Sequence, residues 1–340
     1  MYEFEIIDFQ DVNISEFNGF PNKLLFTTIP WLEFLKVNKG VDPLIVRIKF
    51  NKKYIGYFTA GIKNMFGIKI VGAPFRGWVT PFMGLDLLDD NDNELRISIL
   101  KELWQFLKNT TSAMYMEVID YNILQKDLAN HNVKWILSQD LECEISNNEE
   151  DIIQSFKKSC RNLVRQFPRK GGIVKQVFNV KSFCSIYYQQ LVETFACQGL
   201  RPSYSQQLLE NLIYKMNSIS ESNVLLLEAF DNNNNCIATH FSFSYGDIAY
   251  NFGDTTDKKA QKHYNQGTYM YYAAMKYWMA KDIKLFDLMG VRKYKYRFNP
   301  KIINHVRICF AKFDVLIILR DLAQKVYWLI NSLSYKIGKL

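Results

Sequence analysis

The chain has 340 residues, enough for one large domain or two smaller ones. Apolar residues make up 48% of it and aromatic residues 15%, against 16 Gly and 8 Pro, which excludes an intrinsically disordered or collagen-like chain. The 42 Lys and Arg residues exceed the 34 Asp and Glu residues by 42 − 34 = 8, so an anionic partner is favoured.

The predicted elements of the first half alternate short strands with helices. We expect strands at 2–8, 44–50, 54–62, 68–71, 113–118, 134–137 and 141–145, and helices at 30–37 and 94–109. The loop at 72–84 concentrates Gly, Pro and aromatic residues, so it either lines a cleft together with Arg76 or simply connects two strands.

The second half is predicted to begin at an acidic run after residue 148, where carboxylates suit the positive end of a new helix. Helices are expected at 149–167, 181–197, 205–217 and 266–281, with a terminal helix that ends near 336, and strands at 173–178, 223–230, 236–245, 247–252, 284–288 and 302–312. Each half is therefore a mixed α+β unit with a meander of strands, which suggests a duplicated fold.

One face of the predicted helix 149–167 is basic. Lys158, Arg161 and Arg165 fall within about 60° of one another at 100° per residue, and apolar side chains occupy the opposite face. Between residues 151 and 181 there are eight Lys or Arg against one acid. The pattern indicates an anion-binding surface, and a merely solvated helix face is the alternative.

A second basic cluster follows the strand at 284–288. Lys and Arg alternate with aromatic residues there, at Arg292, Lys293, Tyr294, Lys295, Tyr296, Arg297 and Phe298. This mixture suits phosphate pairing and stacking on a ring, although charged side chains on a packed strand give the same pattern.

The short loop before the helix at 266–281 is a candidate phosphate site. The first backbone N–H groups of a helix have no partner within the helix, so Gln266, Gly267 and Thr268 are candidate ligands for an anionic cofactor.

Acids at strand ends are the candidates for proton transfer. Asp254 and Asp287 are candidate bases or amine-orienting groups and Tyr294 could protonate a leaving group, whereas each of the acids could also be purely structural. His240 could act as a base, and we favour its interpretation as a hydrogen-bonded structural histidine. The other histidines and the six scattered cysteines form no ligand cluster, so we predict no metal cofactor.

These segments together resemble a known group. A strand meander followed by a loop of the form R/Q-x-x-G-x-G/A and a helix resembles the GNAT acyltransferase fold, and Lys262-x-x-Asn265-x-Gly267 fits that pattern in part. The run SCRNLVR at 159–165, leading to KGGIV at 170–174, resembles FemAB/FemX-type proteins. Blocks at 195–202, 271–278, 286–290 and 294–300 extend the likeness over roughly 150–312.

The resemblance implies two GNAT-like domains in tandem, at 1–148 and 149–312, followed by an amphipathic helix at 313–340. It implies an N-acyltransferase that moves an acyl or aminoacyl group to the amine of a sugar nucleotide, a cell-surface glycan or a peptidoglycan precursor, free or lipid-linked. Acyl-CoA is the favoured donor. Aminoacyl-tRNA is the alternative, because Asn265 stands where the CoA-binding pattern has its first Gly. The substrate-binding residues would be Arg76, Lys158, Arg161, Arg165, Lys295 and Arg297.

A hypothesis from a different class is a non-catalytic module whose basic face binds RNA or an anionic membrane. The N-terminus MYEFEIIDFQDV lacks the basic start of a secretory signal, so we expect a cytoplasmic protein. The resemblance implies a bacterial protein, and we expect a monomer or a homodimer. The longest strongly apolar stretch, 315–319, is far shorter than the roughly 20 residues that span a bilayer. Residues 313–340 either rest on the inner face of the membrane or pack on the protein.

Overall fold

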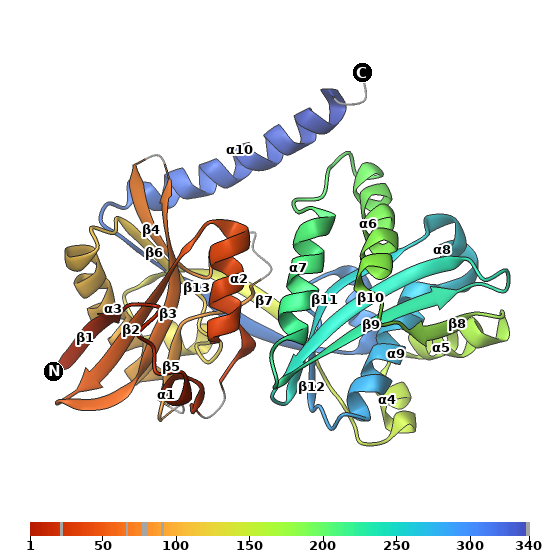
Figure 1. Cartoon of the computed structure of the whole chain (residues 1–340), viewed down its shortest axis with the longest axis horizontal. Coiled ribbons are helices and arrows are strands. Elements are labelled where there is room, and N and C mark those ends of the chain that lie inside the picture. Colours follow the sequence, from red (N-terminus) through yellow and green to blue (C-terminus); the bar gives the residue numbers. More distant parts are fainter. Residues whose placement is uncertain (21–22, 66, 77–79, 90–91, 338–340) are drawn as a thin grey trace. The chain divides into compact units, whose positions relative to one another are not determined.

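The computed structural model describes residues 1–20, 23–65, 67–76, 80–89 and 92–337, with the side chains of 328 and 332–337 left aside. The chain forms two compact units (Figure 1). Unit 1 comprises Met1–Gln139 and Ile303–Ala323, and unit 2 comprises Asp140–Ile302 and Gln324–Leu340. These limits differ from the predicted 1–148, 149–312 and 313–340, because the late strand β13 (Lys301–Ala311) pairs antiparallel with β6 (Tyr115–Val118) of unit 1.

Unit 1 is a mixed sheet covered by helices. Its strands follow the order β1-β2-β3-β4-β6-β13, with β5 paired to β3. The remaining strands and the helices are β1 (Tyr2–Ile7), β2 (Asp42–Phe50), β3 (Lys53–Met65), β4 (Ile68–Ala73), β5 (Leu85–Leu87), α1 (Ile14–Asn18), η1 (Leu25–Thr27), α2 (Ile29–Lys39), α3 (Asn93–Thr110) and η2 (Gln125–Leu128). Strands β1 to β4 form an antiparallel meander, and β4 then pairs parallel with β6.

Unit 2 repeats this architecture with the strand order β7-β12-β11-β10-β9-β8. Its strands are β7 (Lys134–Glu144), β8 (Ile173–Gln176), β9 (Ser222–Phe230), β10 (Cys236–Tyr245), β11 (Ile248–Thr256) and β12 (Leu285–Asp287). Its helices are α4 (Glu149–Ser155), α5 (Lys158–Arg169), α6 (Val180–Ala196), α7 (Gln206–Asn217), α8 (Lys258–Tyr264), α9 (Gln266–Met279) and η3 (Lys293–Phe298). The predicted meander is present as β9, β10 and β11, and β12 lies parallel to β11.

Helix α9 is central to unit 2 because nearly all of its surface is apolar or aromatic. Met270, Tyr271, Ala274, Met275 and Trp278 are all buried in one core cluster. At roughly 25 cal/mol for each Å² of apolar surface removed from water, this burial is the main force that fixes α9 against the sheet. The helix is therefore a rigid platform for any polar side chain that it carries.

Three predicted elements take a different form. The single helix expected at 149–167 is two helices, because Phe156 adopts an extended backbone and its ring packs edge-on against Phe298, 5.3 Å between centroids. The polar loop before α9 contains the helix α8, capped by the Asp257 carboxylate, which accepts a hydrogen bond from the Ala260 amide. The basic block after β12 is the 3-10 helix η3, so the packed-strand alternative is wrong.

Two further predictions reach the limits of the described residues. In the loop predicted at 72–84, residues 77–79 lie outside them, as do residues 338–340 of the helix predicted at 313–340. That helix, α10, spans Val315–Ile337. Within the described ranges, no helix is long and apolar enough to cross a bilayer.

Candidate active site

Three hydrogen-bond donors converge on the carboxylate of Asp254 in unit 2. His240 Nδ1 lies 2.6 Å from Asp254 Oδ1. The Tyr271 hydroxyl donates to Asp254 Oδ2 over 2.6 Å, and Asn251 Nδ2 donates to the same oxygen over 2.9 Å. Two strands and helix α9 thus supply one small polar cluster inside an apolar core.

A β-bulge in β11 brings the strand residues of this cluster to one face. Asn251 and Asp254 are three residues apart, so in a regular strand their side chains would point to opposite faces. The pairing with β10 shifts between Phe241, opposite Gly253, and Ser242, opposite Asn251, which leaves Phe252 as the extra residue. The bulge restores both side chains to the face that α9 covers.

The far side of the histidine ring is also hydrogen-bonded. His240 Nε2 lies 3.0 Å from Ser242 Oγ, which accepts a hydrogen bond from Trp278 Nε1 at 3.0 Å. Because an indole N–H can only donate, the Ser242 hydroxyl proton can point to His240 Nε2, and the Nδ1 proton then points to Asp254. The predicted hydrogen-bonded His240 is confirmed, and its ring orients Asp254.

A second tyrosine connects the cluster to the surface. The hydroxyls of Tyr271 and Tyr294 lie 3.2 Å apart, and Tyr294 in η3 is 44% exposed. Because the proton of Tyr271 is directed to Asp254, Tyr294 is the donor in that contact, and its own oxygen keeps lone pairs for other groups. Asp254, Tyr271 and Tyr294 thus form a chain of hydrogen bonds from a buried carboxylate to an accessible phenol.

The environment separates the proton affinities of these groups. Burial raises the pKa of Asp254, but the donors His240, Asn251 and Tyr271 outweigh it, and the net pKa is lowered. Burial and the nearby Asp254 charge raise the pKa of Tyr271 well above its ordinary value and that of Tyr294 to about 12. Near neutral pH, the cluster therefore holds an ionised carboxylate beside protonated phenols.

The cluster lies where two strands of unit 2 separate. The parallel ladder of β11 with β12 runs from Ile248 opposite Leu285 to Tyr250 opposite Asp287. Strand β11 continues to Thr256, so Asn251 and Asp254 lie on the part of it beyond this ladder.

Asp287, the other predicted catalytic acid, belongs to a different cluster. Only 1% of its surface is exposed, and its Oδ1 accepts the Met289 amide over 2.7 Å. Burial, and then the neighbouring Asp140, raise the pKa of Asp287 well above its usual range. Asp140 in turn accepts the amides of Leu141 and Gly290. The structure does not bring Asp287 together with Asp254.

Lys295 shapes the turn after β12. It is 5% exposed, and its ammonium group donates to the carbonyls of Leu288, Met289, at 3.1 Å, and Gly290, at 3.2 Å. Those three bonds use all three N–H donors of the ammonium group. Lys295 therefore has partners within the chain in place of the predicted contact with substrate.

Arg297 lies beside the start of α9. Its Nη1 donates to Thr268 Oγ1 over 2.7 Å, and its carbonyl accepts the Lys157 amide at the start of α5. The predicted substrate-binding Arg297 and the predicted cofactor-binding Thr268 are therefore in direct contact.

The three residues at the start of α9 are largely engaged within the chain. Gln266 is buried, and its Nε2 donates to the carbonyls of Ile237 and Asp257. The Gly267 amide donates to Gln261 Oε1 at 3.4 Å, and the Thr268 amide to Asn265 O. These two amides are thus not aimed outward at an anion.

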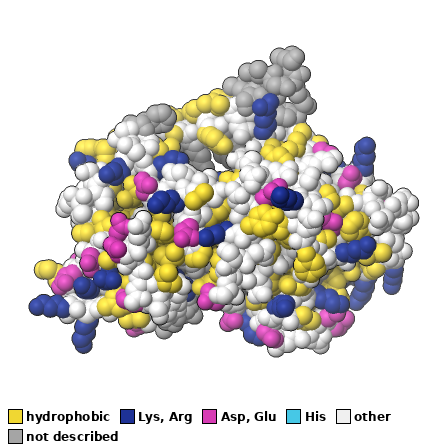
Figure 2. Space-filling view, viewed as in Figure 1, with side chains coloured by type: hydrophobic (Ala, Val, Ile, Leu, Met, Phe, Trp, Pro, Cys, Tyr) yellow, Lys and Arg dark blue, Asp and Glu magenta, His cyan; other side chains and the backbone are white. Residues whose placement is uncertain are grey.

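The basic residues of α5 differ in how much they are occupied. Arg161 donates to the carbonyls of Gln154 and Phe156 and so closes the end of α4. Lys158 and Arg165 are exposed, and Arg165 is 4.0 Å from Glu150. Lys and Arg side chains also project from the outer edge of unit 2 on the right of Figure 2.

Arg76 belongs to unit 1 and to another charge cluster. Its Nη1 lies 3.1 Å from Asp321, and its amide donates to Glu117 Oε1. Glu117 is buried and also pairs with Arg307 at 3.0 Å and with Arg320. The Arg76 side chain therefore belongs to the ion-pair network around Glu117.

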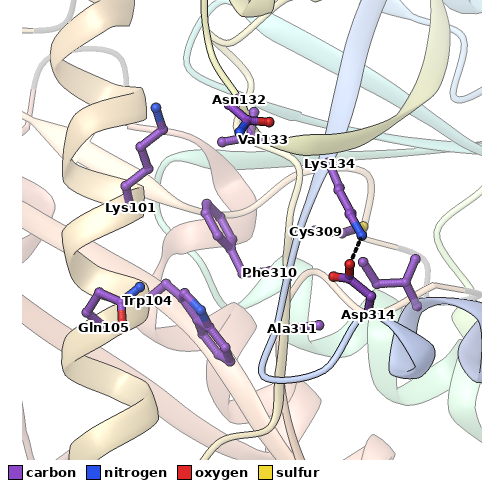
Figure 3. A pocket seen from close by; sticks show the side chains of 11 residues that line it. Lys101, Trp104, Gln105, Asn132, Val133, Lys134, Cys309, Phe310, Ala311 and Asp314 are labelled. Atoms are coloured by element: carbon purple, nitrogen blue, oxygen red, sulfur yellow. Dashed lines mark ion pairs between the residues drawn. The ribbon is translucent and has the colours of Figure 1, made fainter.

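Unit 1 has a pocket of about 360 Å³, and none of the predicted site residues lines it. Trp104 and Phe310 form an aromatic wall, and Lys134 is paired with Asp314 at 2.7 Å (Figure 3). Within the described residues, no group of three or more His, Cys, Asp or Glu side chains is arranged to hold a metal ion.

Sequence reasoning missed Asn251 and Tyr271. Tyr271 is one of 20 tyrosines and carries no signal of its own, and Asn251 lies three residues before Asp254, a spacing that predicts opposite faces. The periodicity of α9 was the available signal for Tyr271, since a buried tyrosine hydroxyl needs a partner.

Comparisons with known proteins agree with this architecture. No protein-family model matches the sequence, and the curated proteins contain no match. Among solved structures, the chain is similar to FemX, with a TM-score of 0.67 and 11% identity over 90% of this chain and 96% of that one. It is also similar to a tandem GNAT protein from the clavulanic acid biosynthesis pathway, with a TM-score of 0.55 and 8% identity over 92% of this chain and 98% of that one.

A third solved structure, L-PGS from Bacillus licheniformis, has a TM-score of 0.51 and 8% identity over 86% of this chain and 94% of that one. The chain has the FemX-like tandem GNAT fold. The predicted α+β class, with mixed sheets flanked by helices and a helix at the C-terminus, is confirmed.

Proposed function

We propose that the protein is an N-acyltransferase whose reaction centre is the Asp254–Tyr271–Tyr294 cluster. The observation that carries the proposal is the continuous hydrogen-bonded path from an ionised, mostly buried carboxylate to a protonated phenol at the surface. The FemX-like fold adds support, because FemX and the tandem GNAT protein share the architecture that holds this cluster.

Each residue has a role that suits its proton affinity. Asp254 has a lowered pKa and a side chain that is 16% exposed, so it attracts and orients an amine rather than removing its proton. Tyr294, with a pKa of about 12, is protonated at neutral pH and suits a general acid. Tyr271 holds the Tyr294 hydroxyl in place.

The reaction then balances as follows. The amine nitrogen forms a bond to the acyl carbonyl carbon, and the bond from that carbon to the leaving sulfur or oxygen breaks. The Tyr294 hydroxyl turns from the Tyr271 oxygen to the leaving atom and gives its proton to that atom, and the proton that the amine loses restores the phenol. The products are an amide and a thiol or alcohol.

The donor in this proposal is a thioester or an aminoacyl ester. Acyl-CoA would need phosphate ligands, and at the start of α9 the Gly267 and Thr268 amides already have partners within the chain. Arg297, which contacts Thr268, is the cation that this region offers. These residues fit CoA poorly, and aminoacyl-tRNA is therefore an equal alternative as the donor.

The acceptor in this proposal is the amino group of a sugar nucleotide, a cell-surface glycan or a peptidoglycan precursor. The basic side chains of α5 and Arg297 suit a substrate that carries phosphate. A small or lipid-linked acceptor of this kind would place the protein in cell-envelope biosynthesis.

A matrix of donors and acceptors tests the proposal. Acyl-CoA, acyl-carrier-protein and aminoacyl-tRNA donors are each combined with amino-sugar nucleotides and muropeptides, and amide formation is measured by mass spectrometry. Turnover with at least one pair is expected. No turnover with any pair, together with RNA binding that weakens steeply with salt, would replace the proposal with a nucleic-acid-binding module.

A further inference from the structure

Helix α10 carries an apolar stripe along one side. Seven aliphatic residues lie within an arc of about 120° at 100° per residue, and we name them the outer stripe. They are Val315, Ile318, Leu319, Leu322, Val326, Leu329 and Ile330.

The outer stripe is turned to solvent. Its side chains are between 44% exposed, at Val326, and 68% exposed, at Ile318. Figure 2 shows hydrophobic side chains along the described part of this helix. A helix that packs on a soluble protein normally buries such a stripe, so its exposure needs a partner with an apolar surface.

The polar side of α10 is the side that holds the helix to unit 1. Arg320 pairs with the buried Glu117, and Asp321 lies 3.1 Å from Arg76. Leu316, 9% exposed, packs with Tyr115 and Cys309. These contacts fix the rotation of the helix about its axis, so the outer stripe cannot turn inward without breaking a buried ion pair.

The charges at the border of the outer stripe are basic. Lys312 and Lys325 are exposed. Asp321 is the only acid in residues 315–330, and it lies on the attached side. Asp314, before the helix, is paired with Lys134 at 2.7 Å. An anionic surface therefore complements both parts of this face, the apolar stripe and its basic border.

We propose that the outer stripe of α10 lies on an anionic lipid surface, with the helix parallel to the membrane plane. A helix of this kind inserts its apolar side to about 5–10 Å and keeps lysines at the headgroups. Phe313 and Tyr327 are more than half exposed at 54% and 51%, and aromatic rings suit the same interface. A symmetric pair with a second copy would instead bring the basic borders together. This proposal holds whatever reaction the protein carries out.

Vesicle flotation of the full chain tests the proposal. The vesicles contain phosphatidylcholine alone or with about 30 mol% phosphatidylglycerol, an anionic lipid that attracts basic segments to the surface. We expect flotation with anionic vesicles only. The triple variant Leu322→Gln, Val326→Gln and Ile330→Gln should stay at the bottom of the gradient.

The matched control removes three exposed aliphatic side chains of unit 1 that lie outside α10. It combines Ile14→Gln, Val37→Gln and Leu88→Gln, which are 58%, 80% and 53% exposed. The control should float like the parent, and circular dichroism should show all three proteins folded. Equal flotation of parent and stripe variant, or a parent that never floats, would overturn the proposal.

Two further outcomes separate the membrane from other partners. Replacement of Lys312 and Lys325 by Gln should weaken binding to anionic vesicles about fivefold for each lysine. Each lysine near such a surface contributes about 1 kcal/mol, which corresponds to that factor. If size measurements instead show a dimer that the stripe variant abolishes, without flotation, the outer stripe is an interface between two copies and the membrane proposal is wrong.

Discussion

Two acid clusters in unit 2 lie on neighbouring strands, and their chemistry is opposite. Asp254 on β11 receives hydrogen bonds from His240, Asn251 and Tyr271, and its pKa is lowered. Asp287 on β12 is more deeply buried and faces a second carboxyl, Asp140, and its pKa is raised well above the usual range. Burial alone therefore does not decide whether a carboxyl is charged, because the neighbouring donors and charges do.

The difference assigns the two clusters to different roles. The Asp254 cluster combines an ionised carboxylate with a path to the exposed Tyr294, which suits an amine substrate. The Asp287 cluster is closed, and its oxygens and the Lys295 ammonium hold the turn after β12. We therefore propose the first as reactive and the second as structural.

The largest expected effect comes from Asp254→Asn. The variant removes the charge that three buried donors face, so the free energy of unfolding at pH 7 should fall by about 2–4 kcal/mol. Asp287→Asn is the matched change on β12 and should alter it by less than about 1 kcal/mol, because Asn resembles the protonated acid. Urea unfolding measures both, and equal losses would contradict the comparison.

Lys295→Met should give the next largest effect. It leaves the carbonyls of Leu288, Met289 and Gly290 without their donor, at a cost of about 1–3 kcal/mol in the free energy of unfolding. Lys293→Met, in the same turn of η3 but exposed, should change it by no more than about 0.5 kcal/mol. If both variants keep the parent's stability while Lys295→Met loses activity, then Lys295 contacts substrate after all.

The pH dependence of the two Asn variants should have opposite sign. The lowered pKa of Asp254 stabilises the fold above the ordinary aspartate pKa of about 4, and this stabilisation is lost as the pH falls. The loss of unfolding free energy in Asp254→Asn should therefore shrink in acid. The raised pKa of Asp287 gives the parent a stabilisation that is complete below about pH 4 and is lost as the pH rises. The free energy of unfolding of Asp287→Asn should therefore increase relative to that of the parent as the pH rises.

For one proton, the difference in unfolding free energy between each variant and the parent can change by at most about 1.4 kcal/mol per pH unit. Urea unfolding between pH 3 and pH 8 measures it. Because Asp287 and Asp140 are neighbours, the change belongs to the pair. Parallel slopes for the two variants would show that the two environments do not differ as described.

The sequence predicted the fold more completely than the site. The alternation that marks β9, β10 and β11 and the aromatic run of α9 come from local residue order, so they could be predicted. Asp254 and Tyr294 were predicted as candidates for proton transfer, and that role stays a proposal. The bulge at Phe252 could not be predicted, because nothing in the local sequence shows that one residue is extra.

Lys295 illustrates a second limit. On the packed-strand alternative for the block at 292–298, Lys293, Lys295 and Arg297 would share one face of an extended segment. In the 3-10 helix, residues three apart share a side, so Lys295 and Phe298 turn inward together. The rotation of α10 was likewise decided by Glu117 and Arg76, which are distant in the sequence.

The turnover number of Tyr294→Phe tests the central claim most directly, once a donor and acceptor pair is found. Loss of a general acid should lower kcat about a hundredfold or more with little change in KM, and the matched variant Tyr296→Phe in the same helix should keep the parent's kcat. The account predicts this split between the two tyrosines. Equal kcat values for Tyr294→Phe, Tyr296→Phe and the parent would contradict it.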